Sequence, residues 1–584
     1  MPGYGYGISD FLTSTKSAAI RSGPSFSGMI TEWTVTAGQT ITLRGQSGSG
    51  ATYLFDVDWG DSSTETGITI SNKTHTYTDA GTYTVKISGQ FAGWEMGGAS
   101  ATDRASLTRF VQWGTETVIQ GVYRMFQQCG NMVYSATDNP TITLTTNVTN
   151  KNRADFIFYL CESVTNLDLS GWNWTNPEII TVTSTMFADC FNLETLNLTG
   201  WNFPNSNTWQ TCFRKVGSTT TNGCNFEWDN LSTKGVNFFY CFQRARFSAF
   251  SMENLTITDA SAGTTLAYSF YQTELLFSTL DLSSWDVSKV DDMTYMFRTT
   301  NFTGTNTFEL NVTGWDTTNL VDMFGWVYEC RYLTDIIGLD SLRGDSLVTN
   351  GFQVAFFNAT RLTFNNNNFH DDFGANWNID TMNSAFYGVA SQSGTTSVPP
   401  NTTNWNTSIV TNFNQVFANF DFSTPNYTMF DVSSGTNLNA MFYLGSGIVN
   451  LDMSQSNMSS SNTTMVNFGR QHSTLQTVDF SNCDFSGVTT FSHMFYGSPI
   501  NSLIFDKSVS FASLNYAVNF LQNNVGGMTT AEYDDFLQRL DTTGLTGAYT
   551  LTAGDSTYTT GGAGDTARAS LVTKGWTITD DGGV

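Results

Sequence analysis

Charged side chains are scarce in this 584-residue sequence: Lys, Arg, Asp and Glu make up 13% of it, about half the share of an average globular protein. The 25 basic residues are outnumbered by 50 acidic ones, which gives a formal net charge of −25. This acidic balance argues against nucleic acids and anionic membrane surfaces as partners. Because no window approaches the roughly 18 apolar residues of a membrane span, we also expect no membrane insertion.

Signatures of catalysis are missing as well. The sequence has four histidines, and it lacks a G-x-S-x-G elbow, an H-E-x-x-H pair and a phosphate-binding loop. His370-Asp371-Asp372 is the one cluster with catalytic residue types, and we predict that it is a solvated loop. The adjacent acids Asp291 and Asp292 are predicted to be solubilising charge. We therefore expect no enzymatic activity.

The start of the sequence lacks the apolar core of a secretory signal. Residues 1–28 are rich in Gly, Ser and Tyr and show no period, so they form either a flexible tail or a segment that orders against a partner. One interpretation is assembly into a virus particle that is released by lysis. The alternative is that a signal has been removed.

Repetition is abundant. In the segment 278–300, Leu280 and Leu282 alternate around Asp281 and predict a short strand, with Trp285 after the turn. A stripe with helical spacing follows and predicts about two turns of helix. The stripe residues at i, i+3 and i+7 are Val290, Met293 and Phe297.

Copies of this unit recur, each with one residue, here called the anchor, in the place of Phe297. Successive anchors are separated by 25 residues (417 to 442) to 32 residues (126 to 158), within the range of leucine-rich repeats. We predict a solenoid of about 14 coils over residues 91–527, roughly 65–70 Å long. The predicted anchors are Phe126, Phe158, Phe187, Phe213, Phe242, Phe270, Phe297, Val327, Phe356, Phe386, Phe417, Phe442, Phe468, Phe495 and Phe520.

Cysteines and tryptophans also keep fixed repeat positions. Cysteines three residues after an anchor are predicted to be buried free thiols rather than disulfides or zinc ligands; they are Cys129, Cys161, Cys190 and Cys330. Tryptophans next to the strands have two interpretations, core packing or stacking on the sugar rings of a glycan. The four candidate binding residues are Trp172, Trp201, Trp285 and Trp315.

Residues 29–90 show short alternating strands separated by Gly/Ser turns, which predict a small β-sandwich. The stretch V-D-W-G-D-S at 57–62, with H-T-Y at 75–77 and G-T-Y-T-V at 81–85, resembles the polycystic-kidney-disease (PKD) domain family. Members usually have glycine where Ser62 stands. The resemblance implies an immunoglobulin-like spacer or binding module. Asp56, Asp58 and Asp61 could hold calcium or hydrogen-bond within the turn.

Residues 280–297 read L-D-L-S-S-W-D-V-S-K-V-D-D-M-T-Y-M-F, which resembles the BspA-type leucine-rich repeats of bacterial surface proteins. This resemblance extends over roughly residues 95–525 and implies a surface-exposed interaction protein. After it, Thr529-Thr-Ala-Glu532 forms a capping box before a helical face, and residues 567–572 predict a second helix closed by Gly575. We expect residues 528–584 to cap the solenoid.

The expected fold class is therefore mainly β with short helices: an immunoglobulin-like sandwich, a leucine-rich-repeat solenoid and an α+β cap. The expected function is a virion fibre, spike or capsid-decoration protein, located on the virion surface. It would bind virion structural proteins through its N-terminal region and a cell-surface glycan or protein through its solenoid. The alternatives are a BspA-type cell-surface adhesin and a polysaccharide-degrading enzyme. The sequence leaves the receptor and the oligomeric state open.

Overall fold

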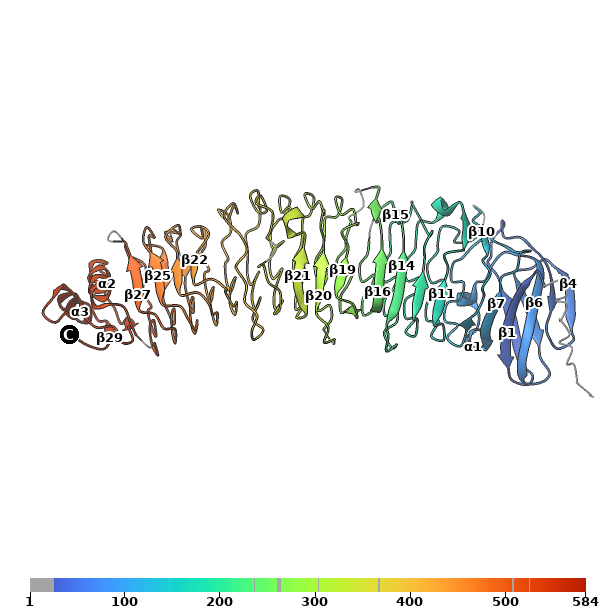
Figure 1. Cartoon of the computed structure of the whole chain (residues 1–584), viewed down its shortest axis with the longest axis horizontal. Helices are drawn as coiled ribbons and strands as arrows, with labels where there is room; N and C mark the ends of the chain where they lie inside the picture. The colour runs from blue at the N-terminus through green and yellow to red at the C-terminus, as the bar shows by residue number, and fades with distance from the viewer. Residues whose placement is uncertain are drawn as a thin grey trace, which may run out of the picture.

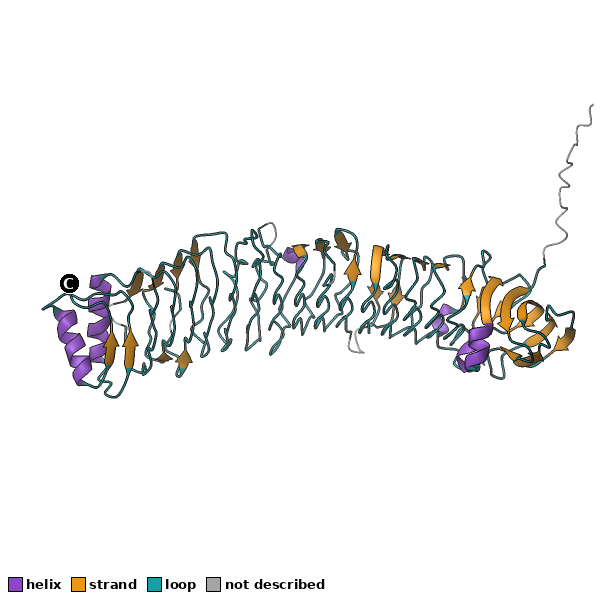
Figure 2. Cartoon of the chain, turned by 90° about the horizontal axis from the view of Figure 1, so that it is seen from below, coloured by secondary structure: helices purple, strands orange, loops and turns teal. Residues whose placement is uncertain are grey.

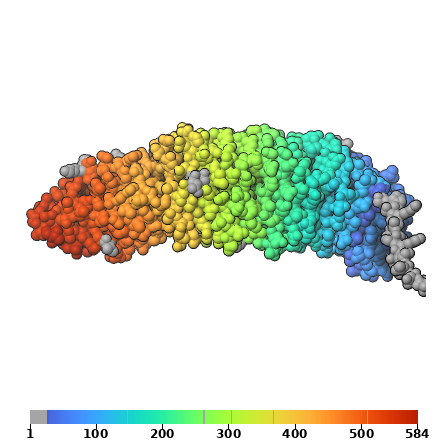
Figure 3. Space-filling model, viewed as in Figure 1, coloured from blue at the N-terminus to red at the C-terminus, as the bar shows by residue number. Residues whose placement is uncertain are grey.

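The molecule is a long, gently bent rod of stacked coils with a β-sandwich at its N-terminal end (Figures 1 and 3). This computed structural model describes residues 26–145, 148–235, 237–259, 264–302, 304–365, 368–456, 458–506, 509–524 and 526–584. Most of the predicted attachment segment, residues 1–28, lies outside the described residues. The expected mainly-β class, with a sandwich followed by a solenoid of stacked coils, is confirmed.

Two antiparallel sheets form the sandwich, in the orders β4-β3-β6-β1-β7-β9 and β2-β5. The short strand β9 runs parallel to β7, so the larger sheet continues into the first coil. Trp33 and Trp59 are fully buried in the sandwich core. The elements are β1 (Met29–Val35), β2 (Thr40–Arg44), β3 (Tyr53–Asp58), β4 (Thr64–Ile68), β5 (Asn72–Thr76), β6 (Gly81–Phe91), α1 (Ala101–Ser106), β7 (Leu107–Gln112) and β9 (Val133–Tyr134).

Parallel strands of neighbouring coils pair in register along the rod. Leu280 pairs with Leu310, and Leu310 pairs with Ile336, so apolar side chains stack on one another from coil to coil. The sheets and their strands are β8 (Val118–Ile119), β10 (Thr141–Thr143) and β12 (Asn173–Thr175); β11 (Asn166–Asp168), β13 (Thr195–Asn197), β14 (Cys224–Trp228), β16 (Arg246–Met252) and β18 (Glu274–Leu275); β15 (Ser232–Thr233) and β17 (Thr256–Ile257); β19 (Thr279–Asp281), β20 (Phe308–Asn311) and β21 (Leu333–Ile337); β22 (Asn426–Thr428), β23 (Asn450–Asp452), β25 (Thr477–Phe480) and β27 (Ser502–Phe505); and β24 (Thr463–Thr464) and β26 (Val488–Thr490).

The predicted helix that ends at Phe297 was wrong. This segment is a series of turns, because Tyr295 has a left-handed backbone with φ of 51°. The backbone N–H groups of Tyr295 and Phe297 donate to the carbonyls of Phe324 and Trp326 in the next coil, over 2.8 and 2.9 Å. Intervening residues donate within their own coil, as Arg298 does to Tyr295. We call this stack of segments, each from four residues before the anchor to three after it, the turn ladder.

Left-handed residues mark the register of the turn ladder, two positions before and two positions after each anchor. Two predicted anchors are corrected by this register. Gly469 donates its N–H group to Met494 in the next coil, and Leu521 donates to Thr552 beyond the last coil, as anchors do. Phe468 and Phe520 instead donate within their own coil. The helix-like apolar spacing therefore belongs to a ladder of hydrogen bonds between coils. At Gly469 and Leu521 the anchor lies one residue later in the sequence than predicted.

All eight cysteines are buried with free thiols, as predicted. The thiol of Cys190, three residues after its anchor, donates to the carbonyl of Phe158, the anchor of the preceding coil, over 3.0 Å. Threonine does the same elsewhere: the hydroxyl of Thr300 donates to the carbonyl of Phe270 over 3.0 Å. This position therefore takes a small side chain that can satisfy a buried carbonyl.

The thiols should react only after unfolding. Burial raises the pKa of Cys190 and Cys330 to about 12, so thiolate is nearly absent at neutral pH. We expect no labelling by a thiol reagent in buffer, full labelling in denaturant, and the same gel mobility with and without reductant. A disulfide between Cys129 and Cys161, mapped by mass spectrometry, would contradict this placement.

Two helices and two short strands follow the last coil (Figure 2). The predicted capping box is confirmed, since Thr529 and Glu532 cap each other's backbone at the start of the first helix. Phe536 of this helix packs on Phe511 and Phe520 of the last coil, with ring centroids 5.2 and 5.8 Å apart. The elements are α2 (Thr530–Thr542), β28 (Thr550–Thr552), α3 (Ala563–Thr573) and β29 (Thr577–Thr579).

Candidate functional site

Half-buried aromatic side chains recur along the middle of the rod, one per coil over successive coils from residue 240 to residue 387. This segment is coloured green to yellow in Figure 3. Each aromatic residue lies two residues before or one residue after its anchor. Because the anchor side chain points into the core, these neighbouring positions of the turn ladder reach the surface. We call the row the tyrosine ladder; its members are Tyr240, Tyr268, Tyr295, Tyr328, Phe357 and Tyr387.

Neighbouring rings of the tyrosine ladder are in contact. The centroids of Tyr268 and Tyr295 are 5.2 Å apart, and those of Tyr295 and Tyr328 are 5.6 Å apart. Phe357 stacks nearly parallel between Tyr328 and Tyr387, at 4.8 and 4.7 Å with interplanar angles of 9° and 14°. Stacked rings cover each other's faces, so this end of the ladder presents ring edges outward.

Arg298 lies within the ladder. Its guanidinium carbon is 4.8 Å from the ring centroid of Tyr295 and 5.3 Å from that of Tyr328. It also lies 5.5 Å from the ring of Tyr271, which flanks the row. These cation–π contacts hold the cation against the rings instead of extending it into solvent.

The phenol groups of the ladder are available to a ligand. Among the residues that the structure describes, the hydroxyls of the five ladder tyrosines have no protein hydrogen-bond partner, and none of these oxygens is enclosed. Partial burial raises the pKa of Tyr295 and Tyr328, so both are protonated donors at neutral pH. The ladder is therefore a rigid aromatic row with unused hydrogen-bonding capacity.

The four tryptophans proposed as binding residues lie in the core. Trp172, Trp201, Trp285 and Trp315 are 4, 0, 2 and 1% exposed. The indole N–H of Trp285 donates to the carbonyl of Met252 over 2.9 Å, and Trp315 donates to Leu282 over 2.8 Å. Their burial favours the packing interpretation, and a binding role for them stays a prediction.

The three aspartates considered for calcium each accept hydrogen bonds within the sandwich. Asp56 accepts from the N–H of Gly67 over 2.7 Å, and Asp58 accepts from that of Gly60 over 3.0 Å. For Asp61, burial opposes ionisation, but hydrogen bonds from Ser63 and His75 outweigh it and lower the pKa to about 2. The contacts of Asp58 and Asp61 are those of the turn interpretation, whereas Asp56 bonds across to strand β4.

The cluster at His370 is a polar turn. The Nδ1 atom of His370 accepts from the backbone N–H of Asp372 over 3.0 Å, and both aspartates of the cluster are exposed. Burial raises the pKa of Asp291, with the neighbouring Asp292 adding to the effect. Within the described ranges, no three His, Cys, Asp or Glu residues converge in a way that could hold a metal ion.

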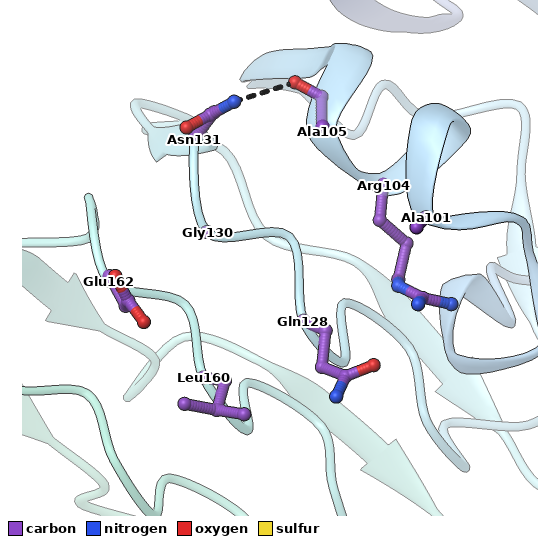
Figure 4. Close-up of a pocket in the computed structure, with 8 residues that line it drawn as sticks. All are labelled: Ala101, Arg104, Ala105, Gln128, Gly130, Asn131, Leu160 and Glu162. Carbon is purple, nitrogen blue, oxygen red and sulfur yellow. Dashed lines mark hydrogen bonds between the residues drawn. The ribbon is translucent and has the colours of Figure 1, made fainter.

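A shallow pocket of about 370 Å³ lies where α1 meets the first two coils (Figure 4). Arg104 of α1 and Glu162 of the second coil both line it. Asn131 donates to the carbonyl of Ala105 over 2.9 Å and joins α1 to the coil. The pocket is open and no buried polar group of its lining lacks a partner, so we assign it no ligand.

Comparison with known proteins finds two families in the chain. Residues 30–92 match the PKD domain, which confirms the resemblance of the sandwich. Residues 100–228, 236–369, 350–477 and 380–504 match a family described as "Mycoplasma protein of unknown function, DUF285". These overlapping matches span more than half of the chain and confirm its repeated organisation. No curated protein and no solved structure matches. No helix in the described ranges is long and apolar enough to cross a bilayer.

Proposed function

The chain belongs to the family described as Mycoplasma protein of unknown function, DUF285, and from this premise we propose that it is a non-enzymatic, surface-exposed interaction protein. A repeat solenoid that follows a PKD domain fits a structural or adhesion-type role. The observation that carries the proposal is the tyrosine ladder, because a contiguous aromatic row at a surface marks an interaction site.

The ends of the rod have different roles in this proposal. The N-terminal region, residues 1–28 with the sandwich, attaches the protein to its carrier, and the coils present the binding surface. Residues 528–584 cap the apolar end of the array, which is supported by the packing of Phe536 on the last coil. The in-register pairing of Leu280 with Leu310 supports the assignment of the coils as leucine-rich repeats.

Two carriers are compatible with this arrangement. A cell-surface adhesin of the BspA type is compatible with the repeated family match and the PKD domain. A virus particle, with the chain as fibre, spike or decoration protein, is the second proposal and is supported by the order of segment, sandwich and rod. Its partners would be virion structural proteins at the N-terminal region.

Antibody labelling tests display and carrier together. An antibody against the coils should label intact cells without permeabilisation. For the virus carrier, the same antibody should detect the protein in purified particles. Deletion of residues 1–28 should abolish display and leave the thermal melting of the solenoid unchanged. Deletion of the coils should keep display, as detected with an antibody against the sandwich, and abolish attachment to target cells. Labelling that appears only after permeabilisation, with no particle containing the protein, would overturn the proposed function.

A further inference from the structure

The tyrosine ladder has the dimensions of a track for a linear polymer. The centroids of neighbouring rings from Tyr268 to Tyr387 are 4.7–5.6 Å apart. This spacing is close to the rise between coils. The row is one side chain wide and several coils long. A compact protein hot spot is instead a central cluster surrounded by a rim. A narrow, periodic row fits an extended chain that repeats at the same interval.

The chemistry of the exposed groups selects an oxygen-rich partner. Rings that stand edge-on present their electropositive C–H edges rather than their electronegative faces. The tyrosine ladder also carries phenol hydroxyls that have no partner among the described residues and can both donate and accept. Hydroxyl and ether oxygens match both features, because both accept from the phenols and contact the ring edges, and the hydroxyls also donate to the phenol oxygens.

Charge excludes the polyanions among oxygen-rich linear polymers. Nucleic acids also stack on aromatic rows, but their binding sites combine the row with a basic groove. Among the described cations, Arg298 is the only one whose guanidinium lies over the rings of the ladder. With 50 acidic against 25 basic residues, the chain repels sulfated, phosphorylated and uronic polymers.

From these observations we infer that the tyrosine ladder binds a neutral, linear polysaccharide that lies parallel to the rod. Sugar rings along an extended chain repeat at an interval close to the rise between coils, roughly 4.8 Å. Each coil then meets one sugar, with Arg298 donating to hydroxyls at the centre. This inference rests on the proposed function and names the class of ligand for it.

Native affinity electrophoresis tests the inference with the full chain. The probes are soluble polysaccharides cast in the gel: a cellulose ether, a mixed-linkage β-glucan, a mannan, a galactan and a starch, with heparin as the polyanion. The wild-type chain should be retarded by at least one neutral polymer and not by heparin. The absence of retardation in every neutral gel would overturn the inference.

Variants of the ladder assign the binding to its residues. The double variant Tyr295→Ala/Tyr328→Ala should weaken retardation at least tenfold. Tyr328→Phe, which removes one hydroxyl and keeps the ring, should weaken it roughly three- to tenfold, the effect of one hydrogen bond. The matched controls are Tyr443→Ala and Tyr496→Ala, which occupy the same position after their anchors outside the ladder. They should bind like the wild type.

Cell attachment separates this inference from the proposed function. Periodate cleaves the vicinal diols of glycans, so periodate treatment of target cells should reduce attachment to the level of the double variant. If attachment resists periodate but is lost after protease treatment, the ladder binds a protein and the inference fails, while the adhesion function stands. If ladder variants attach normally and the coil deletion does not, the ligand binds elsewhere on the coils. This result also overturns the inference alone.

Discussion

Replacing Phe297 by alanine is expected to lower the free energy of unfolding by about 3–5 kcal/mol, the usual effect of emptying a buried phenylalanine site. Phe297 is fully buried, and its ring centroid lies 5.4 Å from that of Phe270 and 5.7 Å from that of Trp326 in the adjacent coils. Because each coil is stabilised by its neighbours, the damage should spread beyond one repeat. Denaturant titration followed by circular dichroism, with limited proteolysis, measures both effects.

Tyr295→Ala is the matched control, since it removes an aromatic ring two residues away in the same turn. Tyr295 is half-buried at the surface, so its loss should destabilise the rod by clearly less, about 1 kcal/mol. Leu282→Asp, which places a carboxylate in the core, should be at least as damaging as Phe297→Ala. Equal stability of Phe297→Ala and wild type would refute the proposed core register.

Acidification from pH 7 to pH 4 is expected to destabilise the solenoid by up to about 3 kcal/mol through His472 alone. This side chain is fully buried three residues after the anchor position Gly469, and neither ring nitrogen has a hydrogen-bond partner within the described ranges. Gly445 makes room for it in the preceding coil, where a Cβ atom would lie 2.9 Å from the His472 ring. Burial lowers the pKa of His472 to about 4.

The sign follows from the two protonation states. In the unfolded chain His472 has a pKa near 6.5, so between about pH 6.5 and pH 4 the unfolded state binds a proton that the folded state does not. The contribution of His472 to the free energy of unfolding is therefore complete above pH 6.5 and decreases as the pH falls toward 4. Urea midpoints measured across this range should show the decline.

A comparison of variants isolates this histidine. Burial raises the pKa of Asp322, which gives it the opposite pH dependence, so the informative quantity is the difference between wild type and His472→Ser. Serine suits the site, because Ser498 occupies the same position in the next coil. Parallel profiles for wild type and His472→Ser would show that His472 does not titrate in this way.

The period of the coils could be predicted because anchors, leucines and tryptophans occupy constant positions in sequence. The conformation between them could not. Met293 and Phe297 have helical spacing, yet the N–H of Phe297 bonds to Trp326, 29 residues later (326 minus 297). Spacing within one repeat cannot distinguish a helix from turns that bond to the next coil, because both bury the same residues.

The tyrosine ladder escaped prediction for a related reason. Its members move between two repeat positions, as Tyr295 precedes its anchor and Tyr328 follows its own. Neither position alone is consistently aromatic along the chain, so a pattern confined to one position does not reveal the row. Only a comparison of both positions across successive coils would have revealed a continuous surface row.

The turn ladder also determines how the rod would respond to tension. Its backbone hydrogen bonds run from coil to coil, so a pull between the two ends loads them in series. Peeling one coil from its neighbour frees the 25 to 32 residues between successive anchors, or about 80–115 Å of extended chain. A rod tethered at both ends would lengthen stepwise and dissipate mechanical work at each step. The coils that remain folded would keep their bound ligand.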